Sequence, residues 1–469
     1  MASPRTSRFG PTARRVNIQE SRDKDITNFT AAVIFAIPFA WISGLDFVAF
    51  HAAALYVLFN FKLQTKPGIF AHLLLSVAFV YVISVLVNSF FSTEPIDRYI
   101  AWANNLSVLL VGIIFFRVGK EVGFGLVTSE NAEERRQSLY RSLSFVAAVY
   151  FAFSFVLKMI GLSSVSDEIR IPTLFGLVTP SLPGLLGQYR GVTLSSANWF
   201  GNGLEVRTYL FAPFATGSNL VGMLLGGLWL AFRKNISAPK FVVGFVCVAL
   251  SCYFLTGARS ALVSLVSALL VGGVAVVNPK LRALIFVVAI TTLPIVLPAV
   301  LPFLEAVYNA REGSNDARLN TYQYTLEAVL NTNPLLGLGV RPDLDNFFIV
   351  VGSHQSFLAA LTRGGLIALL LFVIAFLFAL PANMMSMMES QVSQLLKSKG
   401  LWPAAVATMC LTAASLAWML FQDIDAYPIV GTFVFLNIGI MRGLLGGALT
   451  VASNQRTTTA ARVRQHASY

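Results

Sequence analysis

The stretch GSHQSFLAAL, residues 352–361, places a histidine where polar residues give way to an apolar run. His354 is one of only four histidines in the chain. An unperturbed imidazole has a pKa of about 6.5, which makes histidine the usual general base at neutral pH. A structural role competes with this one, in which Ser353 caps the following helix and His354 lies beside it. The residue type alone leaves both roles open.

Two arginines stand at the edges of apolar runs in a similar way. Arg259 lies in LTGARSA, a turn of a few residues between two runs, and Arg207 lies in EVRTYL, just before another run. A guanidinium keeps its charge and offers a planar fork of donors that fits phosphate oxygens, so several together could hold a diphosphate. Each could instead pair with a carboxylate such as Glu205 or Asp316, because structural ion pairs are common.

The elements that would position these residues are transmembrane helices. The 469 residues are 56% hydrophobic and only 12% charged, and the mean hydropathy is +0.71. Such a chain has too little polar surface for a water-soluble globule, which indicates an all-α integral membrane protein. Apolar runs long enough to cross a bilayer predict twelve spans. They lie near residues 28–45, 47–61, 69–89, 99–116, 139–161, 209–232, 240–256, 260–277, 281–302, 356–380, 401–421 and 427–449.

Lysines and arginines predict the orientation of these spans. With the N-terminus in the cytoplasm, most of the 34 basic residues fall in inner segments, as the positive-inside rule requires. Both termini are therefore expected to be cytoplasmic, and His354 to lie outside. The net charge of +12 is explained by topology and requires no nucleic acid. The first span has full length and no small-residue cleavage site follows it, so we expect a retained anchor.

The expected organisation alternates membrane bundles with two long outer segments. The segments, in order, are a cytoplasmic tail at 1–27, an N-terminal bundle at 28–161, a periplasmic or re-entrant segment at 162–208, central helices at 209–302, a periplasmic loop at 303–355 with an amphipathic helix over 316–330, C-terminal helices at 356–449 and a disordered tail at 450–469. Long outer segments in compact proteins usually carry function. The outer side also holds further arginines, namely Arg190, Arg311, Arg318, Arg341 and Arg363. The three cysteines fall in predicted spans, and we expect them to be small core residues without a disulfide or a metal.

Four motifs follow one another between about residues 200 and 380: GARSALVS, ARLNTYQYTL, NTNPLLGLG and HQSFLAALTRGGLIAL. This order resembles the bacterial O-antigen ligase and polymerase superfamily, whose members carry an arginine in a short turn, an arginine-led outer helix, an N-P-L-x-G-x-G turn and a histidine that opens the next span. The resemblance implies the polytopic fold of that superfamily. Residue by residue, it matches Arg259 to the turn, Arg318 to the outer helix, His354 to the loop end and Arg207 to the position before the preceding span. The Arg-x-x-Gly pattern is broken after Arg207, and Arg190 is its rival.

The resemblance implies a glycosyltransferase in the bacterial inner membrane, with its active site on the periplasmic face. It would take a glycan from undecaprenyl diphosphate and attach it to an acceptor sugar, without a metal or another cofactor. Fixed arginines would stabilise charge on the leaving diphosphate, and neutral His354 would take the proton of the acceptor hydroxyl. Direct attack would invert the anomeric centre. The implied partners are the lipid-linked donor, an acceptor on a lipid-linked repeat unit or on lipid A core, membrane lipids and a complex for polysaccharide chain length or export.

Two other classes of protein remain as alternatives. Twelve spans with both ends inside also fit a transporter or a flippase for lipid-linked oligosaccharide, but such proteins usually place ionisable groups near the bilayer midplane, where this chain has few. A passive export scaffold would not require the arginines and the histidine. Within the enzyme class, a polymerase of O-antigen or exopolysaccharide is favoured slightly over a ligase, and a protein-modifying transferase is disfavoured.

Overall fold

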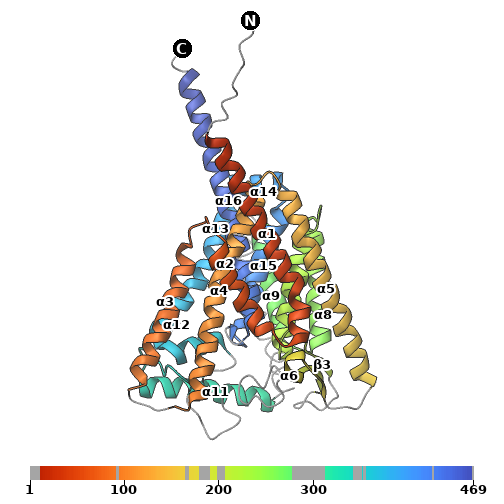
Figure 1. The fold of residues 1–469 in the computed structure, drawn as a ribbon, viewed down its shortest axis with the longest axis vertical. Helices are drawn as coiled ribbons and strands as arrows, with labels where there is room; N and C mark the ends of the chain where they lie inside the picture. Colours follow the sequence, from red (N-terminus) through yellow and green to blue (C-terminus); the bar gives the residue numbers. More distant parts are fainter. Residues whose placement is uncertain are drawn as a thin grey trace, which may run out of the picture.

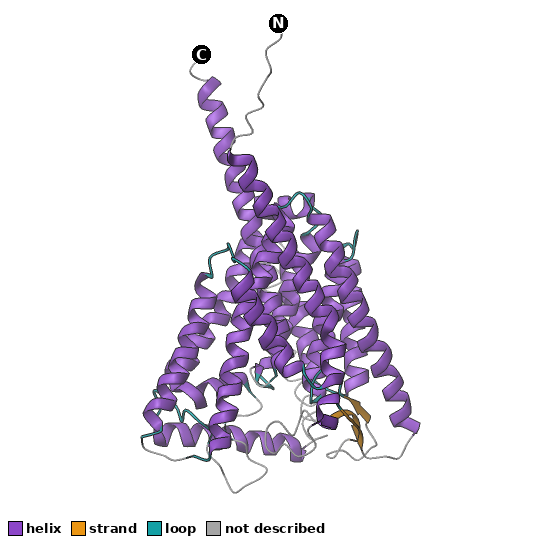
Figure 2. Ribbon diagram, viewed as in Figure 1, coloured by secondary structure: helices purple, strands orange, loops and turns teal. Residues whose placement is uncertain are grey.

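The computed structural model of the protein describes residues 11–90, 94–163, 168–178, 191–197, 206–276, 312–341, 351, 355–424 and 427–466. The fold is a bundle of long helices with a small sheet at one end (Figures 1 and 2). The predicted class, an all-α polytopic membrane protein, is confirmed. The small sheet was not predicted from the periodicity of the sequence.

Within the described part of the chain, nine helices are long and apolar enough to cross a membrane, and two apolar helices are shorter. The long ones are α1 (Pro11–Ser43, apolar from Ile26), α3 (Gly68–Asn88), α4 (Ile96–Thr128), α5 (Ala132–Ser163), α7 (Ala215–Phe232), α8 (Ala238–Thr256), α12 (Ser356–Ala379), α15 (Trp402–Met419) and α16 (Pro428–His466). The shorter ones are α2 (Asp46–Asn60) and α9 (Ser260–Val276). Each predicted span lies on one of these helices except 281–302, which falls outside the described residues.

Two predicted boundaries were wrong. Helix α7 begins at Ala215, not near residue 209, because Pro213 disfavours helical backbone at the residue before it and Phe211 has a positive φ of 60°. The tail expected to be disordered from residue 450 instead continues α16 to His466. No proline interrupts that stretch, so the helix of the last predicted span continues past residue 449. On the same side, α13 (Pro381–Met388) and α14 (Ser390–Ser398) are two short helices between α12 and α15.

The described part of the segment at 162–208 contains a small sheet. Strands β1 (Glu168–Pro172), β2 (Gly191–Ala197) and β3 (Val206–Thr208) form an antiparallel sheet in the order β1-β2-β3, and helix α6 (Leu174–Val178) follows β1. Ile171 pairs with Val192, and Arg207 pairs with the backbone of Ser196. The part of the predicted re-entrant stretch beyond residue 178 lies outside the described residues.

The core is built around the contact between α4 and α16. Glycines let the two backbones approach: a Cβ at Gly119 would lie 2.2 Å from Leu436 O, and a Cβ at Gly443 would lie 2.2 Å from Lys120 O. Small residues at such contacts are the usual basis of helix packing in membranes, where apolar side chains gain little from leaving lipid. This close pair therefore forms the axis of the bundle.

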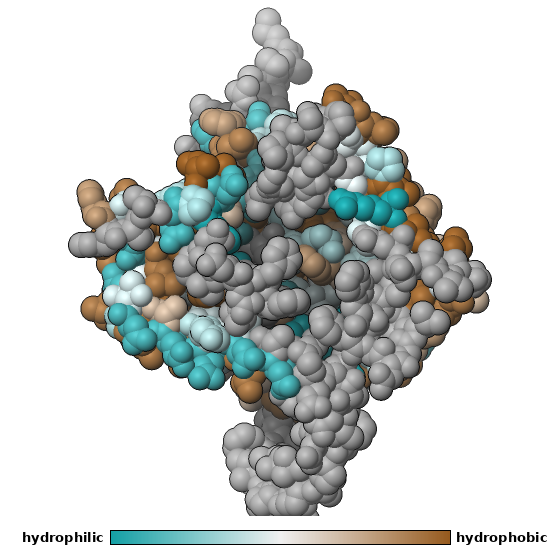
Figure 3. Space-filling view, turned by 90° about the horizontal axis from the view of Figure 1, so that it is seen from below, coloured by the Kyte–Doolittle hydropathy of each residue, from teal (hydrophilic) through white to brown (hydrophobic). Residues whose placement is uncertain are grey.

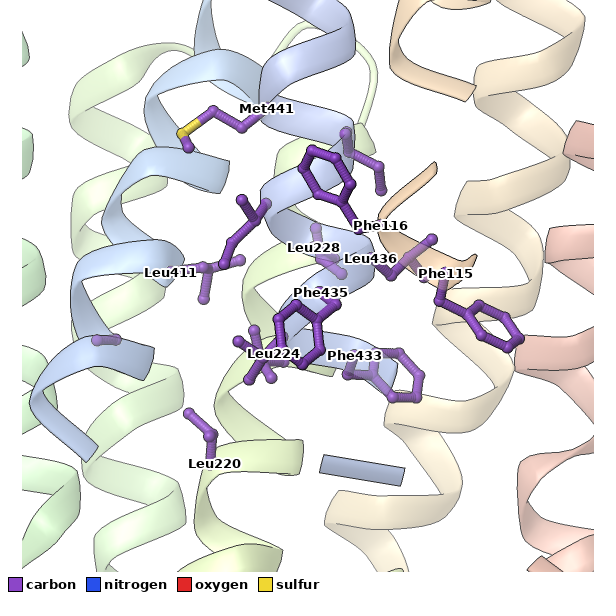
Figure 4. Close-up of a cluster of buried hydrophobic side chains, with 14 of the residues drawn as sticks. Phe115, Phe116, Leu220, Leu224, Leu228, Leu411, Phe433, Phe435, Leu436 and Met441 are labelled. Carbon is purple, nitrogen blue, oxygen red and sulfur yellow. The ribbon is translucent and has the colours of Figure 1, made fainter. Parts of the chain in front are cut away.

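Helices α7 and α15 pack beside that pair and complete the core. Figure 4 shows Leu224 and Leu228 of α7 and Leu411 of α15 directed toward Phe435 and Leu436 of α16. A polar contact also joins α15 to α16, since the side-chain amide of Asn437 donates to Thr408 O and to Thr412 Oγ1, both at 3.0 Å. Most of α7, α15 and α16 is buried, whereas α1, α3, α8 and α12 expose a large apolar share, as helices that face lipid do.

The two ends of the bundle differ in structure. Helix α1 begins and α16 ends at the same end of the molecule, which agrees with an even number of crossings (Figure 1). The opposite end holds the sheet, α6 and α11 (Glu312–Thr332), which runs across the end of the bundle (Figure 1). We call this end the α11 face. Seen from below, its centre is hollowed, and hydrophilic residues gather along one side (Figure 3).

Candidate functional site

Arg259 lies in the short turn that the sequence predicts, between the end of α8 at Thr256 and the start of α9 at Ser260. Gly257 ends α8 with a left-handed backbone, φ 62°, as helix C-terminal glycines commonly do. The hydroxyl of Thr256 donates to Cys252 O at 2.7 Å and accepts from the backbone N–H of Ala258 at 3.3 Å. The turn is thus held on both sides, and the half-buried Arg259 side chain starts from a fixed backbone.

Arg207 lies in strand β3, not at the entry of a helix as its sequence position indicated. The hydroxyl of Thr208 donates to Leu255 O at 3.0 Å, which attaches this strand to the last turn of α8. The ammonium of Lys158 donates to Val206 O and anchors the strand to α5. Nε and Nη2 of Arg207 are shielded from solvent. The structure therefore brings the strand of Arg207 to the helix end that leads into Arg259.

Arg318 lies on α11, near its start, and is half-buried. The helix is present as predicted. Among its apolar residues Val329 is buried, together with Thr321 and Thr325, whereas Leu319 and Leu326 are about half exposed. In a membrane protein an apolar stripe can face lipid as readily as core, so periodicity alone does not define the buried side.

The buried side of α11 brings Tyr322 close to two charged groups, Arg318 and Asp423. Burial raises the pKa of Tyr322, and the negative charge of Asp423 adds to this, while the positive charge of Arg318 opposes it. The phenol is therefore neutral at pH 7 and can act as a hydrogen-bond donor.

Asp423 is the centre of a charged cluster beyond the end of α15. Its Oδ2 lies 2.5 Å from Nη2 of Arg341 and 3.9 Å from Nη2 of Arg363. The side chains of Asp423 and Arg363 are only 5% and 2% exposed, and the Arg363 guanidinium lies 6.0 Å from the ring of Tyr81. Among the described residues one carboxylate thus serves two guanidinium groups, so this part of the cluster, together with Arg318, holds more positive than negative charge.

The cluster lies beside the start of α12, which two hydrogen bonds fix. The hydroxyl of Ser356 donates to Gln422 O at 2.6 Å and accepts from the backbone N–H of Ile424 at 2.9 Å. The residue that precedes the helix is Gln355, in extended backbone and without a side-chain cap, so the capping position is not that of Ser353. His354 and Arg190 lie outside the described residues, and their roles stay predictions. The described chain resumes one residue after His354, next to the cluster around Asp423.

The NTNPLLGLG motif docks onto α12 through backbone groups. The N–H of Leu338 donates to Thr362 O at 2.7 Å, and the N–H of Leu366 donates to Pro334 O at 2.9 Å. Helix α12 is interrupted at this place by Gly365, with φ 65° and ψ −161°. A Cβ at Gly365 would lie 2.2 Å from Leu335 O, so the contact requires glycine. The NTNPLLGLG motif and the part of α12 around Gly365 therefore form one structural unit.

Both groups of arginines flank the end of α15 that lies at the α11 face. The hydroxyl of Ser264 on α9 donates to Ala414 O at 3.0 Å, and the indole of Trp418 donates to Thr216 O at 2.8 Å. These bonds hold α9 and the start of α7 against α15 on one side. On the other side of α15, the chain leads from the end of the helix to Asp423 and its cluster near α12. The sequence did not identify Asp423 or Tyr322 as functional, although the acidic stretch QDID directly after an apolar run was a usable signal.

These features define a polytopic, mainly helical membrane protein that gathers cationic side chains at one end of the bundle. Residues 242–373 match the sequence model of a family described as O-antigen ligase. The match spans α8, α9, α11 and most of α12, and it confirms the resemblance to the O-antigen ligase and polymerase superfamily, whose members are glycosyltransferase-like enzymes. Arg259, Arg318 and His354 fall inside the matched region, and Arg207 and Arg190 fall outside it. No curated protein matches the chain in sequence.

Proposed function

We propose that the protein transfers a glycan from undecaprenyl diphosphate to an acceptor sugar hydroxyl at the periplasmic side of the bacterial inner membrane. The α11 face would be that side, with both termini in the cytoplasm. The observation that carries the proposal is the gathering of arginines on this face. Arg207 and Arg259 lie at one side of the end of α15, and Arg318, Arg341 and Arg363 lie at the other.

The chemistry of transfer requires two kinds of group. As the acceptor oxygen bonds to the anomeric carbon, the bond from that carbon to the phosphate oxygen breaks, and negative charge develops on the diphosphate. Fixed guanidinium groups stabilise that charge, and Arg259, Arg318 and either Arg207 or Arg190 are assigned this role. The acceptor hydroxyl loses its proton to neutral His354, and the attack inverts the anomeric centre.

Asp423 has a different task in this arrangement. Its carboxylate fixes Arg341 and Arg363 and would repel a diphosphate placed directly against it. We therefore assign the cluster to the support of the α12 start, where Ser356 is bonded to Gln422 and Ile424 on either side of Asp423. Rigid support of this kind is what a general base such as His354 requires to stay in reach of its proton.

We favour a polymerase that joins lipid-linked repeat units of O-antigen or exopolysaccharide. The second candidate is a ligase that moves finished polymer to lipid A core, since the match to the family described as O-antigen ligase does not distinguish the two. The two reactions share donor chemistry and differ in the acceptor. A complex for chain length or export would be an additional partner of the polymerase.

The test is to delete the gene and to analyse surface glycans by gel after complementation at matched protein levels. Wild type should restore the glycan, whereas His354→Ala should lower transfer by roughly 10²–10⁴-fold, the usual contribution of a general base. Arg259→Ala should lower it by about 10²–10³-fold, as loss of an oxyanion donor does. Single repeat units on lipid A core in the deletion strain would identify a polymerase, and long chains left on undecaprenyl diphosphate would identify a ligase.

Two variants control for general damage. His72 is exposed on α3, and Arg98 lies near the start of α4, so His72→Ala and Arg98→Ala should restore the glycan like wild type. Full-length glycan from folded His354→Ala and Arg259→Ala would refute the catalytic assignment. Glycans unchanged by the deletion would favour a transporter role instead.

A further inference from the structure

A cavity of about 200 Å³ opens on the α11 face, apart from the arginine clusters. Its walls come from the turn between α1 and α2, from β1 and β2, from the segment before α7 and from the start of α16. The side chains that decide its chemistry are Trp41, Asp46, Arg170, Phe214 and Tyr427. Because these come from four separate parts of the chain, the cavity exists only in the folded bundle.

The lining combines aromatic rings with charged groups. The rings of Phe214 and Tyr427 lie 5.7 Å apart between centroids, and Phe214 is 53% exposed, so an aromatic face is open to an incoming ligand. Trp41 is held edge-on against Phe211 at 5.6 Å on the inner side. Aromatic faces of this kind are suited to the C–H face of a sugar ring, and they gain from burying it.

The polar side of the cavity carries a carboxylate and a guanidinium. Asp46 is the first residue of α2, and the backbone N–H groups of Asp46 and Phe47 bond to its carboxylate. Arg170 lies over Gly191, where a Cβ would be 2.6 Å from Nε, so glycine leaves the room that the arginine occupies. Acceptor and donor groups placed opposite aromatic rings match the hydroxyls of a sugar.

Other ligands fit this lining less well. An acyl or isoprenoid chain would displace water from the Asp46 carboxylate and the Arg170 guanidinium and offer neither a hydrogen bond, which is costly. A phosphate would meet the carboxylate of Asp46 and be repelled. A sugar ring can pack its C–H face on the aromatic rings and form hydrogen bonds from its hydroxyl groups to Asp46 and Arg170.

The cavity is connected to the arginine clusters by two elements. Its wall residues in β2 directly precede Leu194, which accepts a backbone hydrogen bond from Tyr209 at 3.0 Å next to β3 and Arg207. Tyr427 follows Asp423 along the same short segment. We propose that this cavity binds one sugar residue of the acceptor glycan and so positions the acceptor; its place as the acceptor subsite rests on the proposed function.

Binding can be measured without any transfer reaction. The full-length protein in lipid nanodiscs would be tested by saturation-transfer NMR with methyl glycosides of glucose, galactose, N-acetylglucosamine and rhamnose, at up to about 20 mM because single sugars bind weakly. At least one glycoside should give a signal. Asp46→Asn, Arg170→Gln and Phe214→Leu should each reduce it at least about fivefold. Phe153→Leu and Arg233→Gln change exposed residues elsewhere and should leave it unchanged.

Two results would overturn the inference: no signal from any glycoside with wild type, or equal signals from wild type and all three cavity variants. His354→Ala should bind the glycoside normally and fail in transfer, which separates the two proposals. If wild-type protein shows no transfer but the binding pattern holds, the proposed function fails and the sugar site stands. If transfer occurs, and the cavity variants neither raise the KM for the acceptor nor reduce glycoside binding, then the sugar site is refuted and the proposed function stands.

Discussion

At the scale of single residues, the carboxylate of Asp423 balances two guanidinium groups that are largely withdrawn from solvent. Asp423→Asn removes the carboxylate charge that lies 3.9 Å from the buried guanidinium of Arg363, and breaking a buried ion pair typically costs about 3–5 kcal/mol. Asp423→Asn should therefore lower the free energy of unfolding by about that amount. Thermal unfolding of the purified protein in detergent, followed by tryptophan fluorescence, measures the effect.

A matched control separates this effect from a general loss of acidic charge. Asp97 is exposed in the first turn of α4, so Asp97→Asn should leave the unfolding temperature unchanged. The double change Asp423→Leu with Arg363→Met removes both buried charges and should recover part of the loss. An unfolding temperature of Asp423→Asn equal to that of Asp97→Asn would contradict the role given to the cluster.

At the scale of elements, the docking of residues 333–339 on α12 depends on two glycines. A Cβ at Gly337 would lie 2.5 Å from the carbonyl oxygens of both Leu361 and Thr362, and a Cβ at Gly365 would lie 2.2 Å from Leu335 O. Both have positive φ, 71° and 65°. Gly337→Ala and Gly365→Ala should each destabilise the protein by more than about 2 kcal/mol, because backbone atoms cannot move aside as a flexible side chain can.

Gly273 in α9 and Gly446 in α16 have no heavy atom within 4 Å of such a Cβ. Gly273→Ala and Gly446→Ala should be neutral or stabilising by up to about 1 kcal/mol, because alanine favours helix. Unfolding of all four variants in the same detergent gives the comparison. Equal stability of the two pairs would show that the docked turn contributes little.

At the scale of the whole molecule, topology is the basis of the proposed site. In a background with Cys247→Ser, because Cys247 is the exposed native cysteine, a new cysteine at Asn320 on α11 should react with a membrane-impermeant maleimide added to spheroplasts. A cysteine at Ser398, exposed on α14, should react only after the membrane is opened. The opposite pattern would place the arginine clusters in the cytoplasm and exclude periplasmic transfer.

The features that could be predicted from the sequence are those that local residue patterns determine. Helix positions follow from apolar runs, and the turn of Arg259 follows from a glycine between two such runs. The cluster around Asp423 was not predictable, because Arg341, Arg363 and Asp423 come from three separate segments that only tertiary packing joins. Strand β3 is three residues long and has no periodicity to detect, so Arg207 was assigned to a helix entry.

The break in α12 also bears on how the protein is made. In an unbroken helix Thr362 O would accept from the N–H of Leu366, but here Leu338 and Pro334 of the preceding segment supply the two missing partners. A backbone group without a partner costs several kcal/mol in lipid, so α12 needs residues 334 and 338 to satisfy these two groups. Residues 333–339 are synthesised before α12. Biogenesis of this helix is thus coupled to capture of the loop that precedes it, and the outer segment is assembled in the same step as the membrane domain.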